Sequence, residues 1–142
     1  MKTVFKTLHL KTKKKLEISD ITQTIIPLVH ESQITNGLIN IWIPHTTAGL
    51  TVNEHDPDLW NDMLSTMVKL VPLKAHYSHN AKYGPLSREQ NAHAHILSSL
   101  MKPSLSIPLT GGEMILGTWQ SILLVELDGP RNRSLHIQIL GD

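Results

Sequence analysis

The stretch SLSIPLTGGEMILGTWQSILLVELDGPRNRSLHIQIL, residues 104–140, decides the fold class of this 142-residue chain. It contains three apolar runs that have the length and composition of β-strands, at about 104–109, 119–127 and 134–140. Gly111-Gly112 and Asp128-Gly129-Pro130 supply turns between these runs. Because links of hairpin length join antiparallel neighbours, the C-terminal third of the chain predicts antiparallel strands.

Further strands are predicted upstream. Residues 3–10 alternate in polarity and indicate a half-buried strand, on which Leu16-Glu17-Ile18 would pair back as a hairpin. After the turn signal Asn36-Gly37, residues 38–43 are nearly all apolar, which is typical of a strand covered on both faces. A further strand is expected at about 49–53.

Three helices are interspersed with these strands. Asp20 would cap the first, which carries Pro27 in its interior, and Asp56-Pro57 is the clearest helix start in the chain. Asn91 would cap the third helix, which runs to about Met101. The polar segment 73–90 reads as a long connection, and long ordered loops are often functional. This order of elements favours an α+β fold with a largely antiparallel sheet over a parallel βαβ fold.

Length and composition exclude several classes of protein. A chain of this length fits one domain, residues 1–142, and can bury about two-thirds of its unfolded surface. It has no cysteine, so it has no disulfide, thiolate nucleophile or cysteine-bound zinc. A formal net charge of +1 argues against nucleic acid and anionic membranes as partners. No signal-peptide or membrane-spanning stretch is evident, so we expect a cytoplasmic protein.

The chain has nine histidines, which is an unusual number for its length. His9, His30 and His136 have no partner nearby in the sequence and read as surface residues. His93 and His95 point about 200° apart on a helix, so they cannot grip one metal ion together. The helical period places His93 on the apolar face as a buried, hydrogen-bonded side chain, and places His95 in polar surroundings.

Two polar clusters lie at strand ends. His45-Thr46-Thr47 follows one predicted strand, and Asn53-Glu54-His55-Asp56 lies between a strand and a helix start. A helix start favours phosphate or carboxylate, because it concentrates unpaired N–H groups. Instead of binding a ligand, Asp56 could only cap the helix, and His55 could be only an exposed turn residue. For His45 and Glu54 the sequence supports a structural role and a functional role equally.

A third candidate region lies at the start of the predicted strand at 119–127 and just after its end. Trp119 offers a stacking face, although a core position is its alternative, and Gln120 can both donate and accept hydrogen bonds. Arg131 and Arg133 could each bind phosphate through a planar fork, with surface solvation as the alternative. The cluster Lys11–Lys15 reads as a solvated turn, with phosphate attraction as a second interpretation.

These segments together resemble the YjbQ family over essentially the whole chain. The resemblance rests on motifs that occur in the family's order and spacing: HTTAGLTVNE at 45–54, Asp56-Pro57, Asp62-Met63, the segment 91–99, GTWQ at 117–120, and Arg133. It implies a β-sandwich of two largely antiparallel sheets flanked by helices, assembled as a homotrimer.

The resemblance also implies an activity and a set of site residues. Members carry the label secondary thiamine-phosphate synthase, a transferase that joins hydroxymethylpyrimidine pyrophosphate to a thiazole phosphate and releases pyrophosphate. The shared polar positions predict a site for a small phosphorylated metabolite. We expect His45, Glu54 and His95 as catalytic residues, and as substrate-binding residues Thr46, Asn53, Asp56, Thr118, Trp119, Gln120 and Arg133. His93 departs from the family pattern, which argues against a role that requires imidazole there.

Two other functions stay open. One is a metal-dependent hydrolase or transferase, in which His45, His79 and His95 would hold a divalent ion, zinc or magnesium, because three imidazoles and a water suit catalytic zinc. The other is a trimer that binds a metabolite without turning it over. The sequence has no HExxH, P-loop, GxGxxG or GxSxG motif that would point to a different class.

Overall fold

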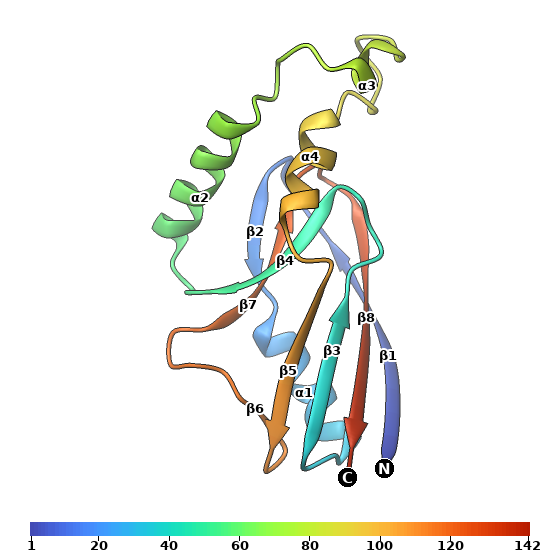
Figure 1. Ribbon diagram of the computed structural model, residues 1–142, viewed down its shortest axis with the longest axis vertical. Helices are drawn as coiled ribbons and strands as arrows, with labels where there is room; N and C mark the ends of the chain where they lie inside the picture. Colours follow the sequence, from blue (N-terminus) through green and yellow to red (C-terminus); the bar gives the residue numbers. More distant parts are fainter.

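The computed structural model describes residues 1–142 as two antiparallel sheets that pack face to face, with helices around them (Figure 1). One sheet has five strands in the order β1-β8-β3-β5-β6, and their bounds are β1 Lys2–Lys11, β8 Asn132–Gly141, β3 Gly37–Trp42, β5 Ser104–Thr110 and β6 Glu113–Met114. The other has three, in the order β2-β7-β4: β2 Glu17–Asp20, β7 Ser121–Glu126 and β4 Ala48–Asn53. The predicted α+β architecture with two antiparallel sheets is confirmed.

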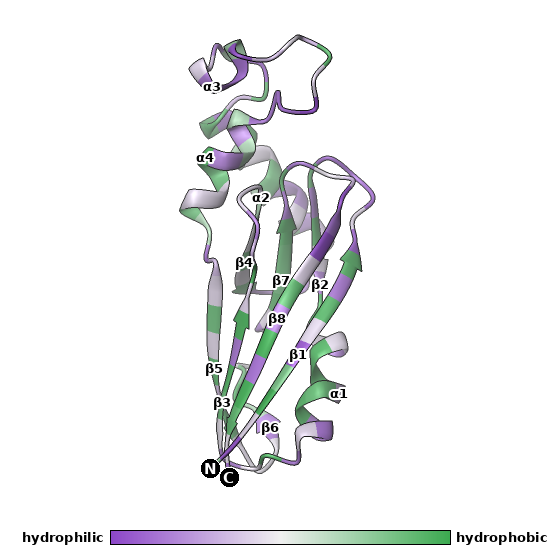
Figure 2. Ribbon diagram, turned by 90° about the vertical axis from the view of Figure 1, so that its right-hand side faces the viewer, coloured by the Kyte–Doolittle hydropathy of each residue, from purple (hydrophilic) through white to green (hydrophobic).

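The main apolar core lies between the two sheets. In β3, Ile39 and Ile41 are buried, whereas Trp42 is 45% exposed. The expectation that this strand is covered on both faces is therefore wrong. β8 alternates in the same way, as the banding in Figure 2 shows. β7 is instead the strand that is buried along nearly its whole length, because it lies in the middle of its sheet.

The predicted hairpin between residues 3–10 and Leu16–Ile18 is also wrong. β1 pairs with β8 along ten residues, whereas β2 crosses to the other sheet and pairs with β7, Ile18 opposite Val125. Ile18 belongs to a second apolar cluster with Leu123 and Val125, and burial there outweighs the short connection to β1. The Glu17 carboxylate accepts the N–H groups of Lys13 and Lys14, which fixes the turn.

Three of the four helices were predicted. They are α1 Thr22–Ser32, α2 Pro57–Leu70 and α4 Ala92–Leu100; the fourth, α3 Ser78–Ala81, is a short turn inside the predicted connection. Asp56 caps α2 by accepting from the backbone of Asp58 and Leu59. Asn91 precedes α4 but makes no side-chain cap: its Nδ2 donates to Asp128, and its Oδ1 is buried without a hydrogen-bond partner. None of these helices is long and apolar enough to span a bilayer.

Candidate functional site

The predicted site residues fall into two groups at opposite ends of the three-stranded sheet. β4 pairs with β7 so that Ala48 lies opposite Glu126 and Asn53 lies opposite Ser121. The six strand residues span five intervals of about 3.3 Å, so the two ends lie roughly 17 Å apart. The end next to Ala48 carries the first group, His45, Thr46, His79, His95 and Arg133. The end next to Asn53 carries the second group, Asn53, Glu54, Asp56, Thr118, Trp119 and Gln120.

A buried ion pair forms the floor of the first end. Arg133 from β8 donates to the Glu126 carboxylate of β7 at 2.7 Å from Nε, and its Nη2 also donates to the carbonyl and hydroxyl oxygens of Thr47. Arg133 and Glu126 are 4% and 1% exposed at their side chains. The pair therefore joins the two sheets and the segment that leads into β4. Arg133 lines the cavity from a position fixed by Glu126.

The Glu126 carboxylate accepts several hydrogen bonds. Thr12 Oγ1 donates to it at 2.9 Å, and so do the backbone N–H groups of Leu127 and Asp128. Burial raises the pKa of Glu126, but the hydrogen bonds from Arg133 and Asp128 and the Arg133 charge outweigh burial and hold the pKa below its usual value. Glu126 is therefore ionised at neutral pH.

His45 stands just after the end of β3 with a defined tautomer. Its Nε2 accepts the backbone N–H of Ser134 at 2.9 Å, so in the neutral ring Nδ1 carries the proton. Burial, and then the positive charge of Arg133, lower the pKa of His45. At neutral pH the ring is therefore uncharged, and its free group is an N–H donor.

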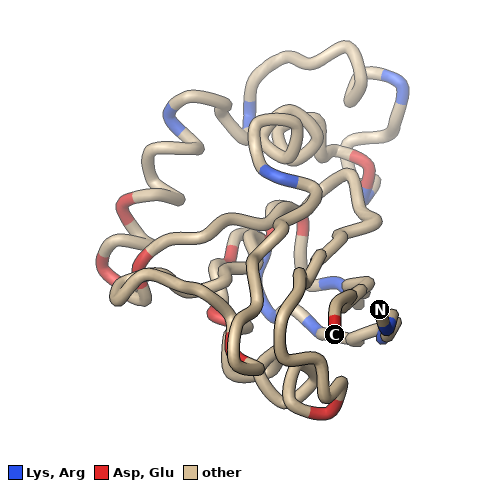
Figure 3. The backbone as a smooth tube through the Cα atoms, turned by 60° about the horizontal axis from the view of Figure 1, so that its bottom comes forward, with Lys and Arg blue, Asp and Glu red and all other residues tan.

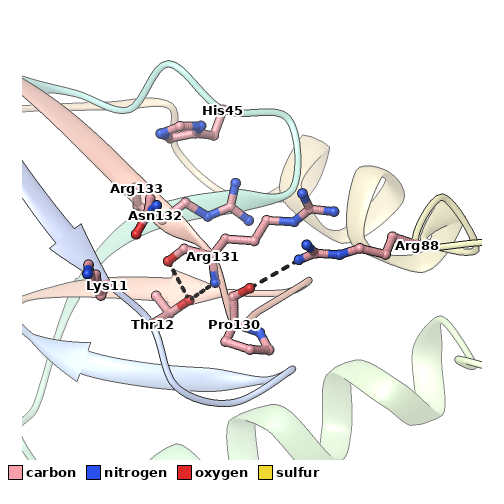
Figure 4. Close-up of a pocket in the computed structure, with 8 residues that line it drawn as sticks. All are labelled: Lys11, Thr12, His45, Arg88, Pro130, Arg131, Asn132 and Arg133. Carbon is pink, nitrogen blue, oxygen red and sulfur yellow. Dashed lines mark hydrogen bonds between the residues drawn. The ribbon is translucent and has the colours of Figure 1, made fainter.

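A basic cavity of about 500 Å³ opens at this end (Figure 4). It has no apolar lining residue and is bordered by Lys11, Thr12, His45, Arg88, Pro130, Arg131, Asn132 and Arg133. Arg131 is held by the Asp128 carboxylate at 2.6 Å, whereas Arg88 donates only to the carbonyl oxygen of Pro130. Lys11 and Arg88 form no ion pair. The cavity therefore presents unneutralised positive charge.

Sequence reasoning missed Arg88 and Lys11 as site residues. Arg88 lies in the 82–91 segment between α3 and α4, far in sequence from the other residues that line the basic cavity, and no motif surrounds it. Lys11 belongs to the lysine cluster that was interpreted mainly as a solvated turn. Two features of the sequence could have pointed to this site: the phosphate attraction considered for that lysine cluster, and the planar fork considered for Arg131.

A second, smaller cavity of about 290 Å³ adjoins the basic one and shares His45, Arg131 and Arg133 with it. His95 and Thr46 also line it, and the carbonyl oxygen of Thr46 accepts from Ser98 Oγ. The ring of His79 lies 4.9 Å from that of His95, centroid to centroid. The first group of predicted residues is therefore brought together around connected cavities.

The arrangement does not provide three ligands for one metal ion within a chain. No group of three or more His, Asp or Glu side chains lies close enough to hold an ion. His79 Nδ1 lies 3.1 Å from Asn80 Oδ1, which leaves Nε2 as its free nitrogen. The metal expectation at His45, His79 and His95 stays a prediction, and no step below uses a metal.

The second group has local structural roles. Asn53 Oδ1 accepts from the backbone of Glu54, and the carbonyl oxygen of Glu54 accepts from Trp60 Nε1. Gln120 Oε1 accepts from the backbone of Gly117, which fixes the turn that also holds Thr118. Trp119 is 72% exposed, so its alternative core position is wrong. This group forms no cavity with His45 in one chain.

Two histidine predictions are confirmed. His93 is fully buried on α4, with Nε2 3.1 Å from the carbonyl oxygen of Leu127, and burial lowers its pKa. His95, two residues later, faces the polar cavity.

Comparison with known proteins bears on this geometry. Residues 6–142 match the family described as UPF0047 protein YjbQ-like. The chain is 40% identical to a UPF0047 protein of Methanocaldococcus jannaschii, over all of this chain and 97% of that one. It is 39% identical to UPF0047 protein YugU of Bacillus subtilis, over 97% of this chain and all of the relative.

Solved structures agree in fold. A YbjQ-like protein of unknown function from Sulfolobus solfataricus superposes with a TM-score of 0.91 at 34% identity, covering 99% of each chain. A hypothetical protein from Aeropyrum pernix gives 0.90 at 35% identity over the full length of both. This chain belongs to the YjbQ family, UPF0047.

Proposed function

We propose that the basic cavity binds the phosphate group of a small metabolite and that the protein is a transferase acting on it. The observation that carries this proposal is the set of cations that line the cavity: Lys11 and Arg88 without carboxylate partners, together with Arg131. Phosphate oxygens are acceptors only, and guanidinium and ammonium groups are donors only. A cavity without apolar lining suits such a group.

His45 adds a neutral donor to these cations. Because Nε2 is occupied by the Ser134 N–H, the Nδ1–H is the group free to bond a phosphate oxygen. A donor held in a fixed position stabilises the negative charge that develops on such an oxygen. His95, whose ring nitrogens make no hydrogen bond within the chain, is the better placed residue for proton transfer.

The named reaction that fits this chemistry is thiamine-phosphate synthesis. The thiazole nitrogen forms a bond to the pyrimidine methylene carbon, the C–O bond to diphosphate breaks, and the diphosphate leaves with the electron pair. Arg131, Arg88 and the His45 N–H would stabilise the charge that builds on the leaving group. Thr46 lines the connected smaller cavity.

The experiment measures binding of inorganic phosphate by calorimetry, followed by formation of thiamine phosphate from the two purified substrates. Arg88→Gln should weaken phosphate binding about tenfold, the loss of one charge-assisted hydrogen bond. Lys69→Gln, an exposed change on α2, is the matched control and should leave binding unchanged. Equal affinities in Arg88→Gln and the unchanged protein would overturn the proposal. Binding without turnover of either substrate would favour the non-catalytic alternative.

We also propose that the protein acts in the cytoplasm as a homotrimer. The two ends of the three-stranded sheet differ in charge: the end at the start of α2 carries Asp56 and Asp58 close to Glu54, while the other end carries the basic cavity. In Figure 3, Asp and Glu positions gather toward the left of the view, whereas Lys and Arg positions lie along the segments at its top. Contact between such ends of two copies would bring Glu54 near His45. Light scattering should give about three times 15.9 kDa; a monomer would contradict this.

A metal role for His45, His79 and His95 is tested separately. Elemental analysis of protein purified without an affinity tag should find about one equivalent of zinc or another divalent ion per chain if the prediction holds. Less than about a tenth of an equivalent would remove it.

A further inference from the structure

A third cavity lies between the edge of β4 and the edge of β5. It measures about 250 Å³, and five of the nine residues that line it are hydrophobic. Because Val52 belongs to its lining, the cavity lies toward the Asn53 end of β4, whereas the basic cavity lies toward the Ala48 end. We call it the edge cavity, and it shares no residue with the basic cavity.

The backbone of Val52 is unpaired on the side that faces away from β7. In an antiparallel ladder the N–H and C=O of one residue point to the same side, and alternate residues point to opposite sides. Leu50 pairs both groups with Lys102, at 2.9 and 3.2 Å, on the side away from β7. Val52, two residues later, therefore points its N–H and C=O to that same side. No hydrogen bond reaches either group there.

The backbone of Ser106 in β5 is unpaired in the same way. The carbonyl oxygen of Pro103 accepts from the N–H of Ile43, so odd-numbered residues of β5 point their backbone groups toward β3. Pro108 instead turns its carbonyl oxygen to the other side, where the N–H of Ile115 donates to it. Ser106 therefore points its N–H and C=O away from β3, and no hydrogen bond reaches them because β6 pairs farther along the strand.

Two strand edges thus present two N–H donors and two carbonyl acceptors beside the edge cavity, since Val52 and Ser106 both line it. These groups do not satisfy each other, because β4 and β5 belong to different sheets. The two strands meet only at the Leu50–Lys102 bridge, and Figure 1 shows them running in different directions beyond it. A ligand in the cavity therefore needs both donors and acceptors.

One cation and one amide add to these backbone groups. Lys102 lines the cavity, is exposed and forms no ion pair. Gln120 accepts from the N–H of Gly117 through Oε1, so the donors on its Nε2 are free. No Asp or Glu lines the cavity. A carboxylate suits this set of donors, while the two carbonyl oxygens call for a donor on the same ligand.

The remaining wall is apolar and includes Ile107, Ile115 and Leu116. Ile115 is 52% exposed, so a small hydrophobic group placed there would cover apolar surface. One water molecule takes about 30 Å³ of liquid, so the cavity holds roughly eight water-sized atoms. That is the size of one amino acid such as L-valine, and it is too small for a peptide.

We propose that the edge cavity binds a free α-amino acid with a small apolar side chain. The carboxylate accepts from Lys102 Nζ and Gln120 Nε2. The ammonium group donates to the carbonyl oxygens of Val52 and Ser106, and the side chain packs on the apolar wall beside Ile115. This site is separate from the basic cavity, so the inference does not depend on the proposed function.

Calorimetry on the full chain with L-valine and two analogues tests the inference. L-valine should bind at least about tenfold more tightly than N-acetyl-L-valine, which lacks the ammonium group, and than L-valinamide, which lacks the carboxylate. Equal or tighter binding of either analogue would overturn the inference, because the carbonyl oxygens or the cation would then select nothing. No binding of L-valine at concentrations up to about 10 mM would also overturn it.

Two variants locate the binding at the edge cavity. Lys102→Gln should weaken L-valine about tenfold without weakening L-valinamide, because only L-valine carries the carboxylate. Ile115→Ala should weaken L-valine about fivefold through the lost apolar contact. Lys69→Gln, an exposed change on α2 outside the cavity, is the matched control and should change nothing. Equal affinities in Lys102→Gln and Lys69→Gln would overturn the inference and leave the proposed function standing.

Discussion

Glu126→Gln should destabilise the protein strongly, because it removes the charge that compensates a buried arginine. Both side chains of the Glu126–Arg133 pair are at least 96% buried. The Glu126 oxygens accept from the backbone of Leu127 and Asp128, from Thr12, and from both Nε and Nη2 of Arg133. Glutamine keeps one acceptor oxygen, so its NH₂ group must face a donor of Arg133 in either orientation.

The size of the effect follows from that loss. Removing one partner of a buried ion pair costs about 3–5 kcal/mol, because the remaining charge is left uncompensated. Whole domains are stable by only about 5–15 kcal/mol, so a large share of the stability would be lost. The effect should reach the fold as a whole, since Arg133 also binds both oxygens of Thr47 and thereby joins the two sheets.

Equilibrium unfolding in urea measures this prediction, as a lower midpoint with an unchanged slope. Glu113→Gln is the control: the Glu113–His30 pair is 66% and 53% exposed at its side chains, and its loss should cost less than about 1 kcal/mol. If Glu126→Gln costs no more than Glu113→Gln, the reasoning about the buried pair is refuted.

Two further predictions follow. The pKa of His45 lies below its ordinary value of about 6.5, so its contribution to stability is present above pH 6.5 and is lost as the pH falls toward the folded-state pKa. NMR titration should show a neutral ring protonated on Nδ1 at about pH 6.5. A charged ring at that pH would contradict the prediction. Gly37→Ala should lower the free energy of unfolding in urea by about 1–3 kcal/mol, because the new Cβ would lie 2.0 Å from the carbonyl oxygen of Leu140. The control Gly84→Ala meets no atom within 4 Å and should cost less. Equal costs for the two variants would refute this prediction.

Much of the fold could be predicted because local patterns and tertiary packing agree there. Asp56-Pro57 starts α2 as its cap chemistry requires, and the C-terminal strands form where apolar runs alternate with turns. The sequence-based prediction failed where a distant partner decided the outcome. β2 pairs with β7 and not with β1, its neighbour in sequence, because Ile18 is buried against β7 rather than against β1.

The same reason explains the partial success at the site. His45, His95 and Arg133 come from three different elements, and their proximity depends on the β4–β7 register and on the Arg133–Glu126 pair. His45 precedes β4 and Glu54 follows it, so the two residues lie at opposite ends of that strand. Arg88 reaches the basic cavity from an irregular segment, so neither periodicity nor spacing could place it.

The central claim is that the cavity beside His45 is a phosphate site, and its most direct test is to locate a bound tetrahedral anion. Crystals soaked with tungstate, whose anomalous scattering marks its position, should show the anion in the basic cavity within hydrogen-bond distance of His45 Nδ1, Arg88 and Arg131. Tungstate only at other surface positions, or its presence unchanged in crystals of Arg88→Gln, would contradict the account.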